Sequence, residues 1–284
     1  MTVLDLMKRH IDLQWNGVKE PTRNGYRTQL NFMETDPMGK KKIKDVDSVI
    51  AEEWFQDLHE SKGKNYSTLC TLRGILKPAF TRAKKARWVY DNPFDFPMQK
   101  KLYGENKTRE AITRRDMRRF LDFTRTDKHF SRYFNGIYIL FHTGLRISEF
   151  CGLTADDIDF KKHEIHVRRQ LIRIHDGNKM LLYIETPKTK NSVRNVPMFS
   201  SVEEAFRDVI AKRPHLETEP VVWNQEHTEY ATKFLWFDRD KHLEVAQHWQ
   251  NHIRWTLQKF NKTYKEEITQ PISPHVCVPS YILF

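Results

Sequence analysis

The sequence predicts a mainly α-helical protein with a small antiparallel β-sheet, divided between an all-helical domain and a mixed α+β domain. The chain has 284 residues, 39% of them hydrophobic, which is enough for two domains with their own cores. Apolar residues recur at helical intervals over the first hundred positions, whereas apolar and polar residues alternate within 164–197. A polar, basic stretch separates the two patterns. We therefore expect domains at 1–100 and 111–284, joined by a linker at 101–110.

The helical domain is predicted from amphipathic segments. One lies at residues 4–13 and another follows Asp47, which can cap it. The clearest begins at residues 66–68, where a hydroxyl can accept hydrogen bonds from the first free amides, and its apolar face runs from Leu69 to Ala86. Pro78 lies inside this pattern and should kink or split the helix, because it has no amide donor.

The second domain is predicted to mix helices and strands. Thr113, followed by Asp116, is typical of a capping box at a helix start. Residues 176–178 (Asp-Gly-Asn) form a hairpin turn signal between two alternating segments. The expected strands are 164–167, 170–174, 180–184 and 191–197, and the expected helices include 130–142, 200–212 and 245–264.

The charge balance favours a polyanionic partner. Lys and Arg outnumber Asp and Glu by 48 to 37, a formal net charge of +11. The longest strongly apolar run, about 137–141, is far shorter than the ~20 residues of a membrane-spanning helix, so we expect no membrane partner. Neither a secretory signal nor a paired cysteine pattern is visible, which fits a cytoplasmic protein. His275 and Cys277 alone make a poor metal site, so no metal is expected.

Basic residues dominate positions 62–101, where the only acids are Asp91 and Asp95. A solvated helix face usually mixes both signs, so this stretch favours contacts with nucleic-acid phosphates over a merely solubilising surface. The candidate phosphate-contacting residues are Lys62, Lys64, Thr68, Arg73, Lys77 and Lys84, together with Arg169 and Lys190 in the second domain.

The sharpest local motif is residues 142–150 (HTGLRISEF). Gly144 allows a turn between two helices, and Arg146 then stands at the start of the second helix, where it can fork onto phosphate oxygens. Glu149 is three residues further on and can orient that arginine. Taken alone, such an Arg–Glu pair is more often a plain surface ion pair.

The motif, with the segment 153–160 that follows, resembles the first active-site box of the tyrosine recombinase (phage and transposon integrase) family. Residues 186–198 are similar to the hairpin that carries the family's catalytic lysine, and residues 272–277 to the start of its second box. The basic helical region resembles the family's SAM-like core DNA-binding domain. The resemblance spans nearly the whole chain.

The resemblance implies a fold and a chemistry. A tyrosine attacks a DNA phosphodiester, arginines stabilise the charge on phosphorus, and a lysine protonates the leaving oxygen, without a cofactor or a small-molecule substrate. By matching position, Arg146 is the first arginine with Glu149 as its supporting acid, Lys188 is the lysine with Lys190 as the alternative, and His275 opens the second box. Double-stranded DNA is the implied partner, and a homo-oligomer on DNA is left open.

The chain also departs from the family pattern. Val278 stands where the second arginine is expected, and no nucleophile-bearing helix follows; Tyr281 is too close to His275 to be that nucleophile. We therefore expect a catalytic domain incomplete at its C-terminus and a DNA integrase that is inactive in this form. The alternative is a non-catalytic DNA-binding remnant that occupies recombination sites. A further expectation is exposed apolar surface near Trp249, Ile253 and Leu257.

Overall fold

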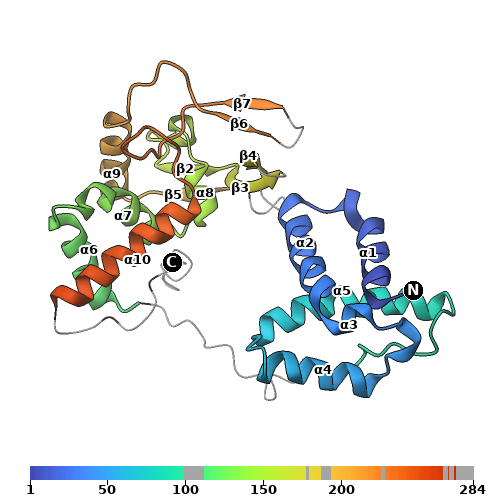
Figure 1. Ribbon diagram of the computed structural model, residues 1–284. Coiled ribbons are helices and arrows are strands. Elements are labelled where there is room, and N and C mark those ends of the chain that lie inside the picture. Colours follow the sequence, from blue (N-terminus) through green and yellow to red (C-terminus); the bar gives the residue numbers. More distant parts are fainter. Residues whose placement is uncertain are drawn as a thin grey trace. The chain divides into compact units, whose positions relative to one another are not determined.

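The computed structural model describes residues 1–98, 112–176, 179–186, 193–224, 228–264, 268 and 272. The chain divides into two compact units, Met1–Thr108 (unit 1) and Arg109–Phe284 (unit 2), drawn in Figure 1. The predicted linker at 101–110 lies outside the described residues, so its position stays a prediction.

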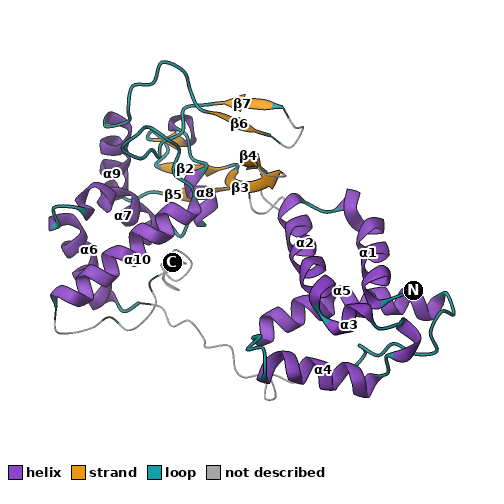
Figure 2. Cartoon of the chain, viewed as in Figure 1, coloured by secondary structure: helices purple, strands orange, loops and turns teal. Residues whose placement is uncertain are grey.

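Helices joined by loops make up the described part of unit 1, apart from one β-bridge between Thr2 and Lys42 (Figure 2). The aromatic rings of Phe55, Phe80 and Phe94 are fully buried at its centre, and the Phe80 and Phe94 ring centroids are 5.1 Å apart. Asp47 caps α4 by accepting a hydrogen bond from the Ile50 amide, as the sequence predicts. The elements are α1 (Val3–Gln14), α2 (Glu20–Thr35), α3 (Pro37–Lys40), α4 (Ser48–Glu60) and α5 (Tyr66–Lys85), with 3-10 turns at Trp15–Gly17 and Ile43–Asp45.

Helix α5 corrects two details of the prediction. Its N-terminal cap is Asn65, whose side-chain oxygen accepts from the Thr68 amide at 2.9 Å, and not a hydroxyl within residues 66–68. The helix also continues past Pro78 without being split. Gly74 and Pro78 both lie on its exposed face, where water can satisfy the carbonyl that loses its donor.

Unit 2 combines helices with two small sheets. One sheet has the order β1-β2-β5 and is antiparallel; the other has the order β3-β4-β6-β7, with β4 and β6 parallel. Strand β5 pairs with β2 and not with the preceding strand β4. The elements are α6 (Arg114–Thr126), a 3-10 turn (Phe130–Tyr133), α7 (Phe134–Thr143), α8 (Ile147–Cys151), a 3-10 turn (Ala155–Asp157), β1 (Ile158–Asp159), β2 (Glu164–Val167), β3 (Gln170–Asp176), β4 (Lys179–Glu185), β5 (Arg194–Pro197), α9 (Ser200–Ala211), β6 (Val221–Trp223), β7 (Glu229–Ala231) and α10 (Ala246–Thr263).

The predicted fold class, mainly helical with small antiparallel β-structure, is confirmed, although the strands form two sheets and not one. Thr113 caps α6 as predicted, by accepting from the Asp116 amide. The helix expected at 130–142 is divided into the 3-10 turn and α7. No described helix is both long and apolar enough to cross a membrane.

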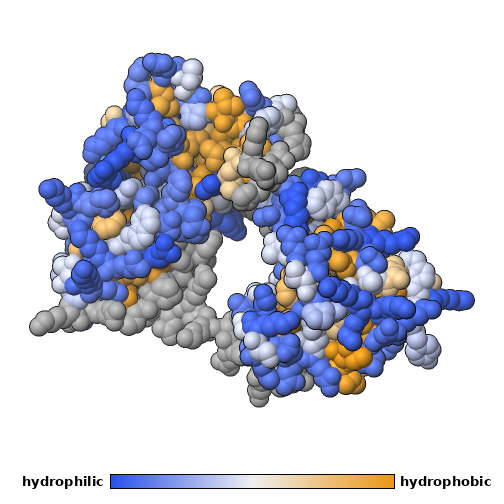
Figure 3. Space-filling view, viewed as in Figure 1, coloured by the Kyte–Doolittle hydropathy of each residue, from blue (hydrophilic) through white to orange (hydrophobic). Residues whose placement is uncertain are grey.

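The core of unit 2 corrects the expectation of exposed apolar surface on α10. Trp249 and Ile253 are buried, and Leu257 is half-buried against the same core. The Trp249 ring meets Phe150 edge to face at 5.0 Å and Trp236 at 5.4 Å. The side of each unit drawn in Figure 3 is mainly hydrophilic, with hydrophobic residues showing near α8 and the sheets of unit 2 and in smaller patches on unit 1. The apolar face of α10 formed by Trp249, Ile253 and Leu257 is therefore covered by other described residues of unit 2.

Candidate active site

The turn between α7 and α8 places Arg146. Helix α7 ends at Gly144, which has a φ of +63°, a left-handed conformation that glycine adopts without steric cost. Arg146 follows as the residue before α8, and its side chain is 59% exposed. The turn thus presents one guanidinium to solvent from a backbone that is fixed on both sides.

A buried carboxylate holds that guanidinium. The Glu149 side chain is 2% exposed and accepts from Arg146 Nη1 at 2.7 Å and from the Arg146 amide at 2.9 Å. Burial raises the pKa of Glu149, but hydrogen bonds from Arg194 and from the Arg146 amide and guanidinium outweigh it and leave the pKa below its usual value. The carboxylate is therefore ionised at neutral pH.

Arg194 is a second ligand of the same carboxylate. Its Nη1 and Nη2 donate to the two Glu149 oxygens at 3.1 and 2.9 Å, which is a bidentate pair. The residue begins β5 opposite Val167 of β2. One negative charge thus lies between two guanidiniums, and the cluster of Arg146, Glu149 and Arg194 keeps a net positive charge with exposed N–H groups.

Arg194 lies within residues 186–198, the predicted hairpin, but the sequence gives it no role at the site. The signal was weak: residues two apart in a strand share a face, so Arg194 lies on the side of the buried Val196, but this does not indicate which residue it meets there. Only the pairing of β5 with β2 brings it to Glu149, which is 45 residues away in sequence.

The other predicted catalytic residues lie outside the described residues. Lys188, Lys190 and His275 all fall there, as does Val278. The segment with the two lysines leaves β4 at Glu185 and returns to β5 at Arg194. Gln170 bridges from Glu185, at 3.0 Å, to the Ser148 hydroxyl, at 3.3 Å, so β4 is linked to α8 beside Arg146.

The lysines predicted to contact phosphate in unit 1 have intramolecular neighbours. Lys84 pairs with Asp91 at 2.6 Å, and Lys77 pairs with Asp95. Side-chain hydrogen bonds from these two lysines lower the pKa of both aspartates. Lys62 pairs with the buried Asp36 at 2.7 Å, and the Lys64 ammonium lies 5.0 Å from the centroid of the Phe32 ring.

Three further candidates are engaged in local structure. Arg73 donates to the Phe94 carbonyl at 3.0 Å and to the Phe96 carbonyl, so it holds the loop after α5. Arg169 is largely buried and donates to Asp157 at 3.0 Å. The Thr68 hydroxyl donates to the Asn65 side chain. The structure thus gives Arg73 and Arg169 partners that sequence spacing does not indicate.

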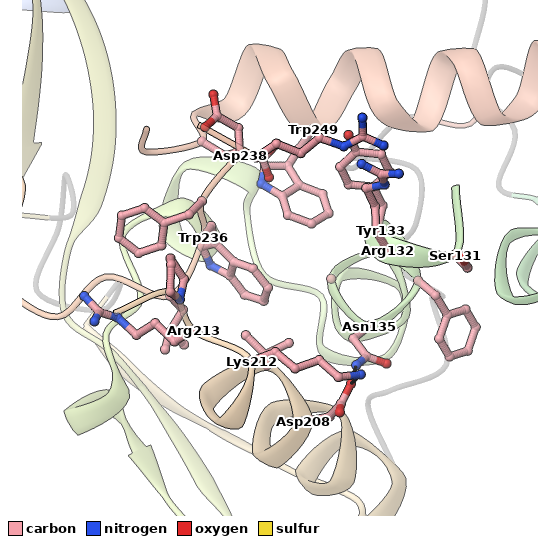
Figure 4. Close-up of a pocket in the computed structure, with 18 of the residues that line it drawn as sticks. Ser131, Arg132, Tyr133, Asn135, Asp208, Lys212, Arg213, Trp236, Asp238 and Trp249 are labelled. Atoms are coloured by element: carbon pink, nitrogen blue, oxygen red, sulfur yellow. Dashed lines mark hydrogen bonds and ion pairs between the residues drawn. The ribbon is translucent and has the colours of Figure 1, made fainter. Parts of the chain in front are cut away.

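A separate pocket of about 810 Å³ lies in unit 2 and contains none of the predicted site residues (Figure 4). Trp249 reaches it from α10, and Asp208 and Lys212 line it from α9. Asp238, on the loop before α10, forms with Asp240 and His242 the one group among the described residues whose ligand atoms could hold a metal ion. These side chains are exposed or half-buried, and such acidic groups are common without a metal.

The model of the phage integrase family matches residues 110–277. The chain is 32% identical over 260 residues to the transposase from transposon Tn916 of Enterococcus faecalis and, equally, to that from Tn1545 of Streptococcus pneumoniae. These matches cover 91% of this chain and 61% of each relative, so the chain spans about three fifths of the length of the curated relatives it matches.

Solved integrase structures are also similar to this chain. The Tn1549 transposon integrase in complex with a circular intermediate DNA superposes with a TM-score of 0.87 at 31% identity, over 98% of this chain and 84% of that one. A lambda integrase dimer bound to a COC′ core site, at 11% identity and a TM-score of 0.62 over 98% and 84% of the two chains, shares the fold. Since the family model matches more than half of the sequence, the chain belongs to the phage integrase family of tyrosine recombinases.

Proposed function

We propose that this chain binds double-stranded DNA as a tyrosine-type, site-specific recombinase that serves integration and excision of a mobile element. The observation that carries the proposal is the Arg146–Glu149–Arg194 cluster, in which a buried carboxylate orients two arginines and leaves a net positive charge. The names of the transposon relatives and the DNA complex of the Tn1549 integrase support it. In this proposal residues 1–100 hold the DNA, residues 111–284 form the catalytic domain, and the reaction takes place in the cytoplasm.

The cluster suits a phosphodiester as its ligand. Arg146 can donate to a non-bridging phosphate oxygen with the N–H groups that Glu149 does not use. Because Glu149 fixes the guanidinium before the substrate arrives, little reorganisation is needed when charge develops on the phosphate. Lys188, with Lys190 as the alternative, would donate the proton to the leaving oxygen, and His275 would assist at the same phosphate.

A second candidate function is DNA occupation without cleavage. It is favoured by Val278, which stands where the family's second arginine is expected. Valine cannot donate to a phosphate oxygen, and the loss of one such donor typically lowers a rate by about 10²–10³. On this second candidate function, the chain by itself binds recombination sites and forms no covalent adduct with them.

Selection from a random duplex library tests the first proposal. The full chain should enrich one sequence, and its affinity should fall steeply with salt because bound phosphates release counterions. Arg146→Gln should weaken binding to the enriched duplex by about tenfold, whereas Arg125→Gln on α6, with an equally exposed side chain, should change it less than about twofold. Failure to enrich any sequence would contradict site-specific function.

A suicide substrate separates the two candidate functions. The enriched duplex is nicked near its centre so that a covalent intermediate, once formed, cannot religate. An active recombinase should leave a denaturation-resistant protein–DNA adduct, whereas a protein that only occupies the site should leave none. An adduct would overturn the non-cleaving proposal and leave the recombinase proposal standing. Light scattering of the bound complex would then show whether the chain assembles on DNA as an oligomer.

A further inference from the structure

Unit 1 carries a second group of basic side chains, which shares only Lys84 with the predicted DNA-binding residues. Lys44, Lys84 and Arg87 line one pocket of about 900 Å³, together with Tyr90. Lys40, Lys41 and Lys42 directly precede it in sequence and are exposed. We call the residues Lys40, Lys41, Lys42, Lys44, Arg87 and Tyr90 the distal basic surface.

The cations of this surface are free, unlike those predicted from sequence. In the described part of the chain, no carboxylate or hydrogen-bond acceptor contacts the side chains of Lys42, Lys44 or Arg87. By contrast Lys62, Lys77 and Lys84 each form an ion pair. A free, exposed cation can bind a phosphate without first giving up an internal partner.

The backbone holds these side chains outward. The Val3 amide donates to the Lys41 carbonyl at 2.9 Å, and Thr2 forms a β-bridge with Lys42. Ile43 is buried between the exposed Lys42 and Lys44, which keeps both lysines directed to solvent. Arg87 has a left-handed φ of +58°, and its amide donates to the Lys84 carbonyl at the end of α5.

Simple stabilisation of a helix end accounts for only part of this surface. Cations at a helix C-terminus interact favourably with its dipole, which explains Lys84 and Arg87. The helix dipole does not explain Lys40, Lys41, Lys42 and Lys44, which come from another segment. Tyr90 is 98% exposed, and its hydroxyl can donate to a phosphate oxygen. The acids nearby, Asp45, Asp47 and Asp91, are fewer than the basic residues.

Arg87 and Tyr90 of the distal basic surface follow the C-terminus of α5, whereas Lys62 and Lys64 precede its N-terminus. Helix α5 has 20 residues and is therefore about 30 Å long, the length of roughly nine base pairs of DNA. Figure 1 shows α4 returning beneath α5, so that the start of α5 and the loop before α4 lie at opposite ends of unit 1. Resting on the DNA binding proposed above, we propose that the distal basic surface binds the phosphate backbone of a second DNA duplex.

A bridging assay tests this proposal. The full chain is saturated with a donor-labelled random-sequence duplex, and an acceptor-labelled duplex is then titrated in while energy transfer is measured. The chain should bring the two duplexes together. Lys42→Gln/Lys44→Gln/Arg87→Gln should weaken capture of the second duplex by about tenfold or more, and leave the first duplex's affinity within about twofold. The matched control Lys128→Gln/Lys161→Gln/Lys162→Gln, three exposed lysines of unit 2, should keep the bridging.

Each other outcome overturns the proposal. Bridging that survives the triple substitution, or that is equally lost in the control, would exclude the distal basic surface as its cause. A different outcome is that the unsubstituted chain bridges no duplexes while the triple substitution shortens the stretch of a single duplex that the protein protects from nuclease. That result would place the distal basic surface on flanking DNA of the same duplex instead. If the chain binds no duplex at all, the proposed function itself fails, which is a different result.

Discussion

The two units hold their basic side chains in different ways. In unit 2, Arg146, Arg194 and Arg169 are anchored by carboxylates whose side chains are only 2% exposed, those of Glu149 and Asp157. In unit 1, Lys77 and Lys84 pair with Asp95 and Asp91, whose side chains are 62% and 74% exposed. The pairs of Arg146, Arg169 and Arg194 in unit 2 therefore have buried carboxylates, whereas those of Lys77 and Lys84 in unit 1 have exposed ones; Lys62 is the exception in unit 1, because its partner Asp36 is also buried.

This difference matches the two tasks that the proposed recombinase function sets. A buried carboxylate that accepts bidentate hydrogen bonds fixes the position of a guanidinium, which chemistry at a phosphorus atom requires. An exposed ion pair contributes about 0–1 kcal/mol and exchanges easily, so its lysine can move to a passing phosphate. We infer that unit 2 holds its arginines in fixed positions, and that the exposed lysines of unit 1 attract DNA phosphates regardless of base sequence.

Removal of the Glu149 carboxylate should have the largest effect. Glu149→Ala removes the acceptor shared by the Arg146 amide and the Arg146 and Arg194 guanidiniums, and each hydrogen bond to a charged group contributes about 1.5–3 kcal/mol. Hydrogen-exchange mass spectrometry of the full chain should show faster exchange in β2, β5 and α8. Unit 1 should be unchanged.

A matched control uses an exposed pair of unit 2. Asp122→Asn removes the partner of Arg125, where both side chains are more than half exposed, and should shift stability by less than about 0.5 kcal/mol. Equal destabilisation by Glu149→Ala and Asp122→Asn would show that an ion pair with a buried carboxylate contributes no more to stability than one with an exposed carboxylate.

Arg73 sharpens the comparison, because it lies in unit 1 but is held like an arginine of unit 2. Its guanidinium donates to the Phe94 and Phe96 carbonyls and stands 5.4 Å from the Phe96 ring centroid. Arg73→Ala leaves these carbonyls unpaired and should destabilise unit 1 by about 1–3 kcal/mol in chemical denaturation. The matched substitution Lys77→Ala, one helical turn further along α5, should cost less than about 1 kcal/mol. If Arg73→Ala instead lowers DNA affinity without loss of stability, Arg73 is a DNA contact, as the sequence suggested.

Arg73 also shows where sequence reasoning ends. Helices α1, α4, α5, α9 and α10 were predictable from apolar periodicity, and the turn at Gly144 from its residue type, because these are local properties. The fate of Arg73 depends on a loop that folds back 21 residues later. The pairing of β5 with β2 depends on long-range packing in the same way, and with it the contact between Arg194 and Glu149. Local spacing cannot distinguish a charge aimed at DNA from one aimed at a carbonyl.

Acid should weaken the Glu149 cluster. The pKa of Glu149 is lower in the folded chain than its ordinary value of 4.5, so its contribution to stability is present above that value and is lost as the pH falls through the folded pKa. The melting temperature of unit 2 should therefore exceed that of Glu149→Gln at neutral pH, and the gap should close below about pH 4.5. Asp122→Asn serves as the control, since its gap should stay small throughout. A gap that is constant with pH would show that Glu149 contributes by packing and not by charge.

The smallest effect is expected from the exposed pairs of unit 1. Asp91→Asn/Asp95→Asn frees Lys84 and Lys77 and raises the net charge by two, so affinity for a random-sequence duplex should rise by about twofold to tenfold at low salt and converge with the unsubstituted chain at high salt. Stability should change little, because both aspartates are exposed. Asp122→Asn/Glu229→Gln makes the same charge change in unit 2 and should raise the affinity less. If the two double substitutions have equal effects, overall charge alone governs DNA binding. Lys77 and Lys84 then do not leave their aspartates to contact DNA phosphates.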